Sequence, residues 1–119
     1  MDDEIPGMKD VMEWFGYKPV FHDAIILAVD LRRDPNPSLI KLFYWRTKKN
    51  FRRDLHALVT FYVEGIESLD LEGWNDNHVS DLDVKYDGES YVMDITSSSG
   101  FDGEIRARKI SVSVEPLQV

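Results

Sequence analysis

The sequence contains no cysteine, which excludes a disulfide scaffold, a thiol nucleophile and a cysteine-ligated zinc or iron–sulfur site. It also lacks any apolar run that approaches the roughly 20 residues needed to cross a bilayer. The chain opens with Met1-Asp2-Asp3-Glu4, whereas a signal peptide opens with positive charge. These absences predict a cytoplasmic protein that does not enter a membrane.

Motifs of several enzyme classes are missing too. The sequence has no Gly-x-Ser-x-Gly nucleophile elbow, no Gly-x-x-x-x-Gly-Lys phosphate loop and no Gly-x-Gly-x-x-Gly turn. A chain of 119 residues fits one domain and leaves little room for the deep, aromatic-lined cleft of a carboxylate glycosidase. We therefore expect a single domain over residues 1–119 that is not an enzyme and needs no cofactor.

Basic side chains are outnumbered: 14 Lys and Arg stand against 22 Asp and Glu, for a formal net charge of −8. The segment from Glu64 to Asp94 holds ten acids and one base, or −9, so the rest of the chain sums to +1. The segment from Lys41 to Arg53 is the opposite, with six bases and no acid. Acidity disfavours direct binding to nucleic acid, because phosphates need clustered Lys and Arg, and it suits a basic protein partner.

One short helix is predicted near the N-terminus. Met8, Val11, Met12 and Phe15 fall at i, i+3, i+4 and i+7, which places them on one apolar stripe. Gly16 follows as the expected C-terminal stop. A helix this short needs packing against another element for its stability.

A period of two follows, as expected for half-buried strands. Asp87-Gly88 is typical of a two-residue hairpin turn, and a change of parity between Ala107 and Ile110 predicts a β-bulge at Arg108-Lys109. The result is a mainly β fold with a minor α+β character: an about seven-stranded, mostly antiparallel sheet or sandwich with one short N-terminal helix. The predicted strands cover residues 21–33, 39–47, 56–64, 66–71, 79–86, 91–95 and 105–114.

His22-Asp23 is the pair most suggestive of chemistry, because an aspartate that orients a histidine makes a general base. Neighbouring strand residues point to opposite faces, however, so the two side chains meet only if a turn or bulge intervenes. We favour a structural role for Phe21, His22 and Asp23, with His22 bonded to the backbone and Asp23 tied to a neighbouring loop. His56 is expected to be solvated.

The loop after residue 72 offers the best candidates for binding. Asp76, His78 and Asp81 are potential metal ligands, but their spacing matches neither a calcium loop nor a helical histidine pair, so no metal site is predicted. A tryptophan in a polar, acidic loop is a typical interface anchor unless its ring folds back onto the core. The predicted partner-binding residues are Glu72, Trp74, Asn75, Asp76, Asp81 and Asp83.

Three stretches resemble the immunity protein 50 family: Phe21-His22-Asp23-Ala24, the run from Val63 to Asn75 with its Gly73-Trp74-Asn75 loop, and the ending from Ile110 to Pro116. Where that family often has Gln-Asn after the loop, this chain has Asn77 and His78. The resemblance implies a small cytoplasmic bacterial protein, encoded beside a polymorphic toxin, which it neutralises by binding. It carries no catalytic residues to transfer.

The expected function is therefore that of an immunity protein whose acidic face binds a cognate toxin, with a basic nuclease as one candidate toxin. Two alternatives stay open. One is a non-catalytic ligand-binding or homo-oligomeric assembly domain that forms a homodimer through an exposed strand edge. The other is a small hydrolase that uses His22 and nearby acids.

Overall fold

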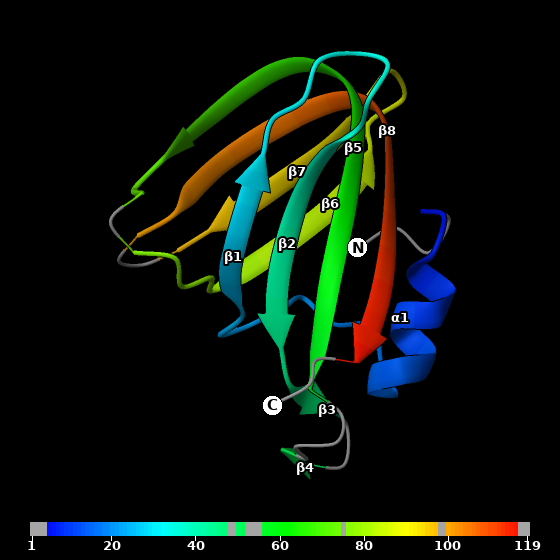
Figure 1. Cartoon of the computed structure of the whole chain (residues 1–119), viewed down its shortest axis with the longest axis vertical. Coiled ribbons are helices and arrows are strands. Elements are labelled where there is room, and N and C mark those ends of the chain that lie inside the picture. Colours follow the sequence, from blue (N-terminus) through cyan, green and yellow to red (C-terminus); the bar gives the residue numbers. More distant parts are fainter. Residues whose placement is uncertain (1–4, 48–49, 52–55, 75, 98–99, 117–119) are drawn as a thin grey trace.

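The computed structural model describes residues 5–47, 50–51, 56–74, 76–97 and 100–116. Six strands form one antiparallel sheet in the order β1-β2-β5-β8-β7-β6, and two short strands, β3 and β4, pair separately. The mainly β fold with one short helix is confirmed, as a single bent sheet (Figure 1). The elements are α1 (Met8–Phe15), β1 (Ile25–Asp30), β2 (Ser38–Tyr44), β3 (Arg46–Thr47), β4 (Asn50–Phe51), β5 (Ala57–Glu72), β6 (Asp81–Tyr86), β7 (Tyr91–Thr96) and β8 (Asp102–Pro116).

The predicted helix is confirmed with its predicted end. The Gly16 N–H donates to the Met12 carbonyl, and Gly16 has a left-handed φ of 82°. Pairing between β7 and β8 stops at Ala107. Further along this edge of β8, the Val112 N–H donates to the Pro6 carbonyl (2.9 Å), so the segment that leads into α1 covers part of the edge. No helix of the described residues is long and apolar enough to cross a bilayer.

The core fills the inner side of the bend. On β2, Ile40, Leu42 and Tyr44 are buried and alternate with half-buried residues, as period two requires. The Phe21 ring packs edge-on against the rings of Tyr44 and Phe61, with centroids 5.2 and 5.7 Å apart. The helix adds the buried side chains of Met8, Val11 and Phe15.

The two longest strands correct two predictions. The predicted break at Gly65 is wrong, because β5 runs on to Glu72; a φ of 65° at Gly65 bends the backbone without ending the strand. The bulge predicted at Arg108-Lys109 is also wrong. β8 pairs residue for residue through that point, and the register shift lies on β5, between Ile66 and Ser68. Gly65 allows β5 to carry the bulge beside it, and both strands arch at this point (Figure 1).

The hairpin between β6 and β7 is confirmed, but its turn is longer than predicted. Tyr86 pairs with Tyr91, so the loop has four residues, 87–90. The Asp87 carboxylate accepts the N–H groups of Glu89 (3.0 Å) and Ser90 (2.9 Å), which stabilises this longer loop.

The two edge strands, β1 and β6, are bridged at one end by residues 76–80. The Ile26 N–H donates to the Asn77 carbonyl (2.9 Å), and the Val79 N–H donates to the Ala24 carbonyl (2.9 Å). On the β6 side, the Leu82 N–H donates to the Val20 carbonyl (2.7 Å). These bonds place the turn that precedes β1 beside the loop that follows β5.

Candidate functional site

Acidic side chains gather on the outer face of the sheet, the side away from the core. On β7, Met93 and Ile95 are buried on the inner side, so Asp94 between them points outward. The same alternation turns Asp83 outward between the buried Leu82 and Val84 of β6. Glu104 precedes the buried Ile105 of β8 and also points outward.

The strand register brings these carboxylates together. Asp83 pairs with Asp94, Asp94 with Glu104, and Glu104 with Asp70 of β5. We call these four residues the acid row: one carboxylate from each of four neighbouring strands, spaced about 4.8 Å apart in the hydrogen-bonding direction. Like charges placed directly opposite each other destabilise a sheet, so this arrangement opposes folding.

A second set of acids lies one outward position further along the strands. Asp81 of β6 pairs with Thr96, and Glu72 of β5 pairs with Asp102 of β8. The acid row and these residues together form what we call the acidic face. Its seven members are Asp70, Glu72, Asp81, Asp83, Asp94, Asp102 and Glu104.

The repulsion within the acid row is seen at Asp94. The pKa of Asp94 is raised above its ordinary value, first by partial burial and then by the charges of Glu104 and Asp83. Lys85 and Arg106, on the opposite side of the acid row from Asp81, partly offset this rise in the Asp94 pKa. Ionised Asp94 is therefore held in an unfavourable field.

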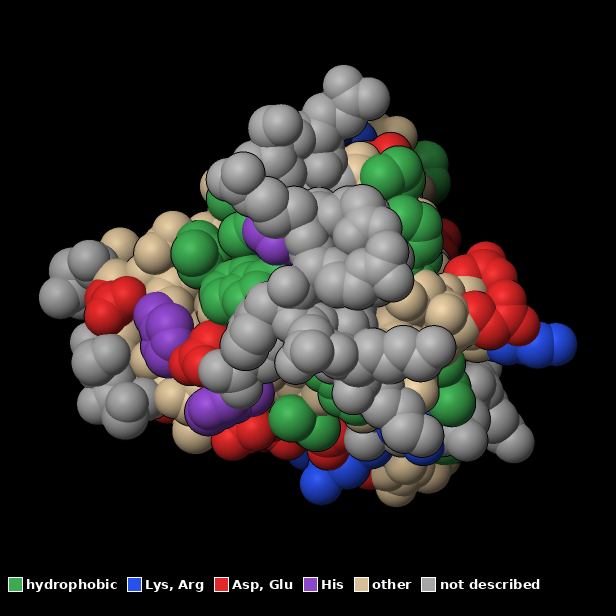
Figure 2. All heavy atoms as spheres, turned by 90° about the horizontal axis from the view of Figure 1, so that it is seen from below, with side chains coloured by type: hydrophobic (Ala, Val, Ile, Leu, Met, Phe, Trp, Pro, Cys, Tyr) green, Lys and Arg blue, Asp and Glu red, His purple; other side chains and the backbone are tan. Residues whose placement is uncertain are grey.

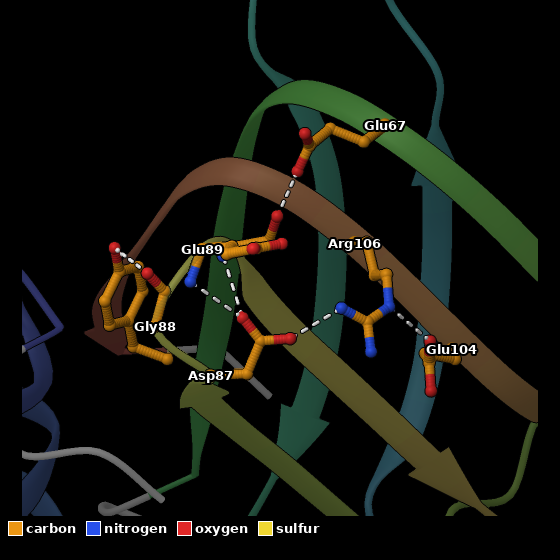
Figure 3. A network of polar contacts seen from close by, with 8 residues as sticks. Glu67, Asp87, Gly88, Glu89, Glu104 and Arg106 are labelled. Carbon is orange, nitrogen blue, oxygen red and sulfur yellow. Dashed lines mark hydrogen bonds and ion pairs between the residues drawn. The ribbon is translucent and has the colours of Figure 1, made fainter.

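Arg106 lies between Glu104 of the acid row and Asp87 of the hairpin loop (Figure 3). Its guanidinium donates to Asp87 (2.6 Å) and to Glu104 (3.0 Å), and both acids raise the Arg106 pKa. Backbone N–H bonds, the strongest from Ser90, together with Arg106 hold the pKa of Asp87 well below its usual range. The Ser90 hydroxyl also donates to the Glu67 carboxylate, which ties the hairpin loop to β5. Around Arg106, two acids are paired with a cation: Asp87 of the hairpin loop and Glu104, which belongs to the acid row.

The structure places three of the predicted binding residues, Glu72, Asp81 and Asp83, on the acidic face. Trp74 lies two residues after the end of β5 and is 61% exposed, although its ring packs edge-to-face with the ring of Phe101 at a centroid distance of 4.8 Å. Its indole N–H donates to the Leu71 carbonyl (3.3 Å). The ring is thus positioned by the protein and still available to a partner. Asn75 lies outside the described residues.

Asp76 has a different place from the sheet acids. It is half-buried, its carboxylate accepts the His78 N–H (3.0 Å), and its carbonyl accepts the Phe101 N–H (2.9 Å). Asp76 therefore organises the loop rather than extending the acidic face. Among the described residues, no three His, Asp or Glu side chains are placed to hold a metal ion together.

The segment Phe21-His22-Asp23 forms a turn, not the start of a strand as predicted, because β1 begins only at Ile25. The Ala24 N–H donates to the Phe21 carbonyl, so the turn brings His22 Nε2 within 3.7 Å of the Asp23 carboxylate. His22 Nδ1–H donates to the Ser80 carbonyl (2.7 Å), which matches the backbone bond predicted for His22.

The Asp23 carboxylate accepts a bond from His78 Nε2 (2.9 Å), the tie to a neighbouring loop that we predicted. Histidine side chains lie beside acidic ones at this end of the molecule (Figure 2). His56, expected to be solvated, instead packs its ring against Phe43 at 5.3 Å.

Four members of the acidic face were not among the predicted binding residues. Asp70 and Asp94 belong to the acidic segment but were not singled out, and Asp102 and Glu104 lie beyond it. Each occupies an outward position of its strand, which the alternation of side chains indicates. Their meeting in one row depends on which strands pair, and local patterns do not contain that information.

Comparison of the chain with protein-family models, with curated proteins and with solved structures found no match. The interpretation of the site therefore rests on its own geometry and charge.

Proposed function

We propose that this protein is an immunity protein, which neutralises a cognate bacterial toxin by binding it through the acidic face. The acid row is the observation that carries the proposal. Four carboxylates in register repel one another across neighbouring strands, so the row costs folding free energy. A basic partner would relieve that repulsion on binding. Binding therefore explains the acid row, whereas the stability of the fold does not.

The geometry of the acidic face suits a partner that binds phosphates. Neighbouring strands lie about 4.8 Å apart, and successive outward positions along one strand lie roughly 7 Å apart, so the carboxylates project from a regular grid of backbone positions. This makes a regular array of negative charge, comparable in kind to a nucleic-acid backbone. A toxin with a basic, nucleic-acid-cleaving active site is the partner chemistry that fits best, and charge would steer the two proteins together.

Trp74 supplies what the carboxylates lack. Charge gives speed and specificity of association more than affinity, so a tight inhibitor also needs an apolar contact that excludes water. Trp74 follows Glu72 by two residues and exposes more than half of its surface at the end of the acidic face. We assign it the role of the apolar anchor.

The experiment is a toxicity assay in bacteria. The candidate toxin, which we take to be the protein encoded immediately upstream, is expressed with either this chain or a variant that carries Asp83→Asn, Asp94→Asn and Glu104→Gln. We expect the wild type to restore growth and the variant to fail, because the acid row is then uncharged at three of its four positions.

The matched control neutralises three exposed acids elsewhere, with Asp10→Asn, Glu13→Gln and Glu115→Gln. It removes the same net charge and should protect as the wild type does. Equal loss of protection in both variants, with both folded, would show that net charge matters and the acidic face does not.

A further inference from the structure

The turn formed by residues 21–24 has an unusual backbone. Phe21 has a φ of 59° and Asp23 a φ of 68°, and neither residue is glycine. A bulky side chain in the left-handed region is strained, and such strain persists only where the surroundings enforce it. Phe21 is fully buried between the rings of Tyr44 and Phe61, so core packing enforces the turn. The fold holds His22 and Asp23 in place at a conformational cost.

From this position, Asp23 binds the loop before β6, which lies 55 residues further along the sequence. Its carboxylate accepts the bond from His78 Nε2 (2.9 Å), and its backbone N–H donates to the Val79 carbonyl (2.8 Å). His22 adds the bond from Nδ1 to the Ser80 carbonyl (2.7 Å). Three consecutive residues of the loop before β6 are therefore fastened to two residues of the turn.

The fastening extends from His78 to the exposed tryptophan. The His78 N–H donates to the Asp76 carboxylate (3.0 Å), and the Asp76 carbonyl accepts the Phe101 N–H (2.9 Å). The Phe101 ring in turn lies against Trp74. Every link in this sequence of contacts is direct, so the carboxylate of Asp23 and the ring of Trp74 are joined through two residues of the loop and Phe101.

We propose that Asp23 is a positioning residue that preorganises residues 76–80 and so, through Phe101, fixes the Trp74 ring in the arrangement that a partner meets. The partner's part in this statement rests on the proposed function; the ordering of the loop does not. A loop that is ordered before binding loses less conformational freedom on binding, which slows dissociation of the complex. The strained turn thus serves the binding site without contacting the partner.

Two substitutions separate the carboxylate from the backbone. Asp23→Gly removes the acceptor of the His78 bond and relaxes the strain, because glycine adopts a φ of 68° freely. Asp23→Asn keeps an acceptor oxygen, and asparagine is among the residues most tolerant of the left-handed region. If Asp23 is a positioning residue, Asp23→Asn should keep the loop ordered and Asp23→Gly should not, even though glycine suits the backbone better.

The readout is hydrogen exchange of single amides, measured by NMR without any partner. We expect Asp23→Gly to speed exchange of the Phe101 amide about tenfold, the equivalent of losing one net hydrogen bond, and to free the Trp74 indole N–H. Asp23→Asn should stay within about threefold of wild type at both groups. The Phe61 amide, in the middle of the sheet, reports global unfolding and should change less than Phe101 in Asp23→Gly.

Unchanged exchange of Phe101 and of the Trp74 indole in Asp23→Gly would overturn the proposal, as would equal exposure in Asp23→Asn. An equal rise at Phe61 and Phe101 would also overturn it, because it would mean global destabilisation alone. Because no partner enters the measurement, failure of the immunity function leaves the result on loop order unaffected. With the upstream-encoded protein as probe, Asp23→Gly should dissociate faster and Asp23→Asn should match wild type.

Discussion

Asp94 is the residue at which the conflict in the acid row is greatest. Burial and its two acidic neighbours raise its pKa above the ordinary 3.8, so the folded protein holds the Asp94 proton more tightly than the unfolded chain does. The stability that this provides is fully present below the ordinary pKa and is lost as the pH rises through the raised value. At neutral pH the ionised carboxylate therefore lowers the free energy of unfolding.

We expect Asp94→Asn to raise the free energy of unfolding at pH 7 by about 0.5–1 kcal/mol, as befits removal of one like-charged cross-strand pair. The gain should shrink as the pH falls through the raised pKa of Asp94 and vanish below the ordinary value of 3.8, where the wild-type carboxyl is neutral in both the folded and the unfolded state. Urea unfolding at several pH values measures this. Glu13→Gln on the exposed side of α1 is the control and should change little. Destabilisation by Asp94→Asn at pH 7 would contradict the account of the acid row.

His22 illustrates a residue whose role is structural. It loses one bond to the Ser80 carbonyl on substitution by alanine, and because the ring is half-exposed, we expect a loss of only about 0.5 kcal/mol of stability. Affinity for the upstream-encoded protein, measured by calorimetry on folded material, should stay within a few-fold of wild type. A large loss of affinity at unchanged stability would instead give His22 a place in the interface.

At the scale of the elements, Gly65 explains why the two longest strands were predicted less well than the others. A glycine between two apolar runs is typical of a break, and the chain at Gly65 does bend. Pairing with β8 carries β5 through the bend, and that pairing is a tertiary contact. The parity change seen in the last strand was real, since Arg108 and Lys109 are both exposed, but the extra residue lies on the partner strand.

Gly65→Ala tests this account of the bend. A Cβ at this position would lie 1.9 Å from Arg108 Nε, but that atom belongs to the exposed end of a flexible side chain, which can move aside. Alanine is disfavoured at a φ of 65°, so we expect a loss of about 1–2 kcal/mol in urea unfolding, supplied by the left-handed backbone. Adding Arg108→Ala to Gly65→Ala should not restore this loss, because the Arg108 side chain is not its cause. Full recovery of stability in the double variant would instead assign the cost to the contact with Arg108.

The candidate site was predictable only in part. The residues that were missed depend on strand pairing, a tertiary contact, as the two mispredicted strands do. The sequence alone located the acidic segment and singled out Trp74, because charge and residue type are local properties; that the ring is exposed is known only from the structure. Glu104 could not be joined to Asp94 without knowing that β8 lies between β5 and β7. The turn at Phe21 was predicted as extended chain, since a buried aromatic in the left-handed region runs against every local preference.

At the scale of the molecule, both edges of the sheet are built to discourage pairing with another chain. β1 has a register shift between Ile26 and Ala28, and the Ile26 N–H at its outer edge already donates to the Asn77 carbonyl. β6 carries Asp81, Asp83 and Lys85 along its length. Charges and bulges on edge strands are known protections against edge-to-edge association. These features oppose a homodimer formed by pairing of strand edges, and the acidic face remains the surface that we propose for a partner.

The most direct test of the central claim, that the acidic face binds a basic protein partner, is the salt dependence of association with the upstream-encoded protein. Stopped-flow mixing compares wild type with the variant Asp83→Asn, Asp94→Asn, Glu104→Gln at low and high ionic strength. We predict that the variant associates at least about tenfold more slowly at low salt and that the difference largely disappears at high salt, because steering is screened. Association that is equally fast for both proteins at low salt, or slowed to the same extent by Asp10→Asn, Glu13→Gln and Glu115→Gln, would contradict the claim.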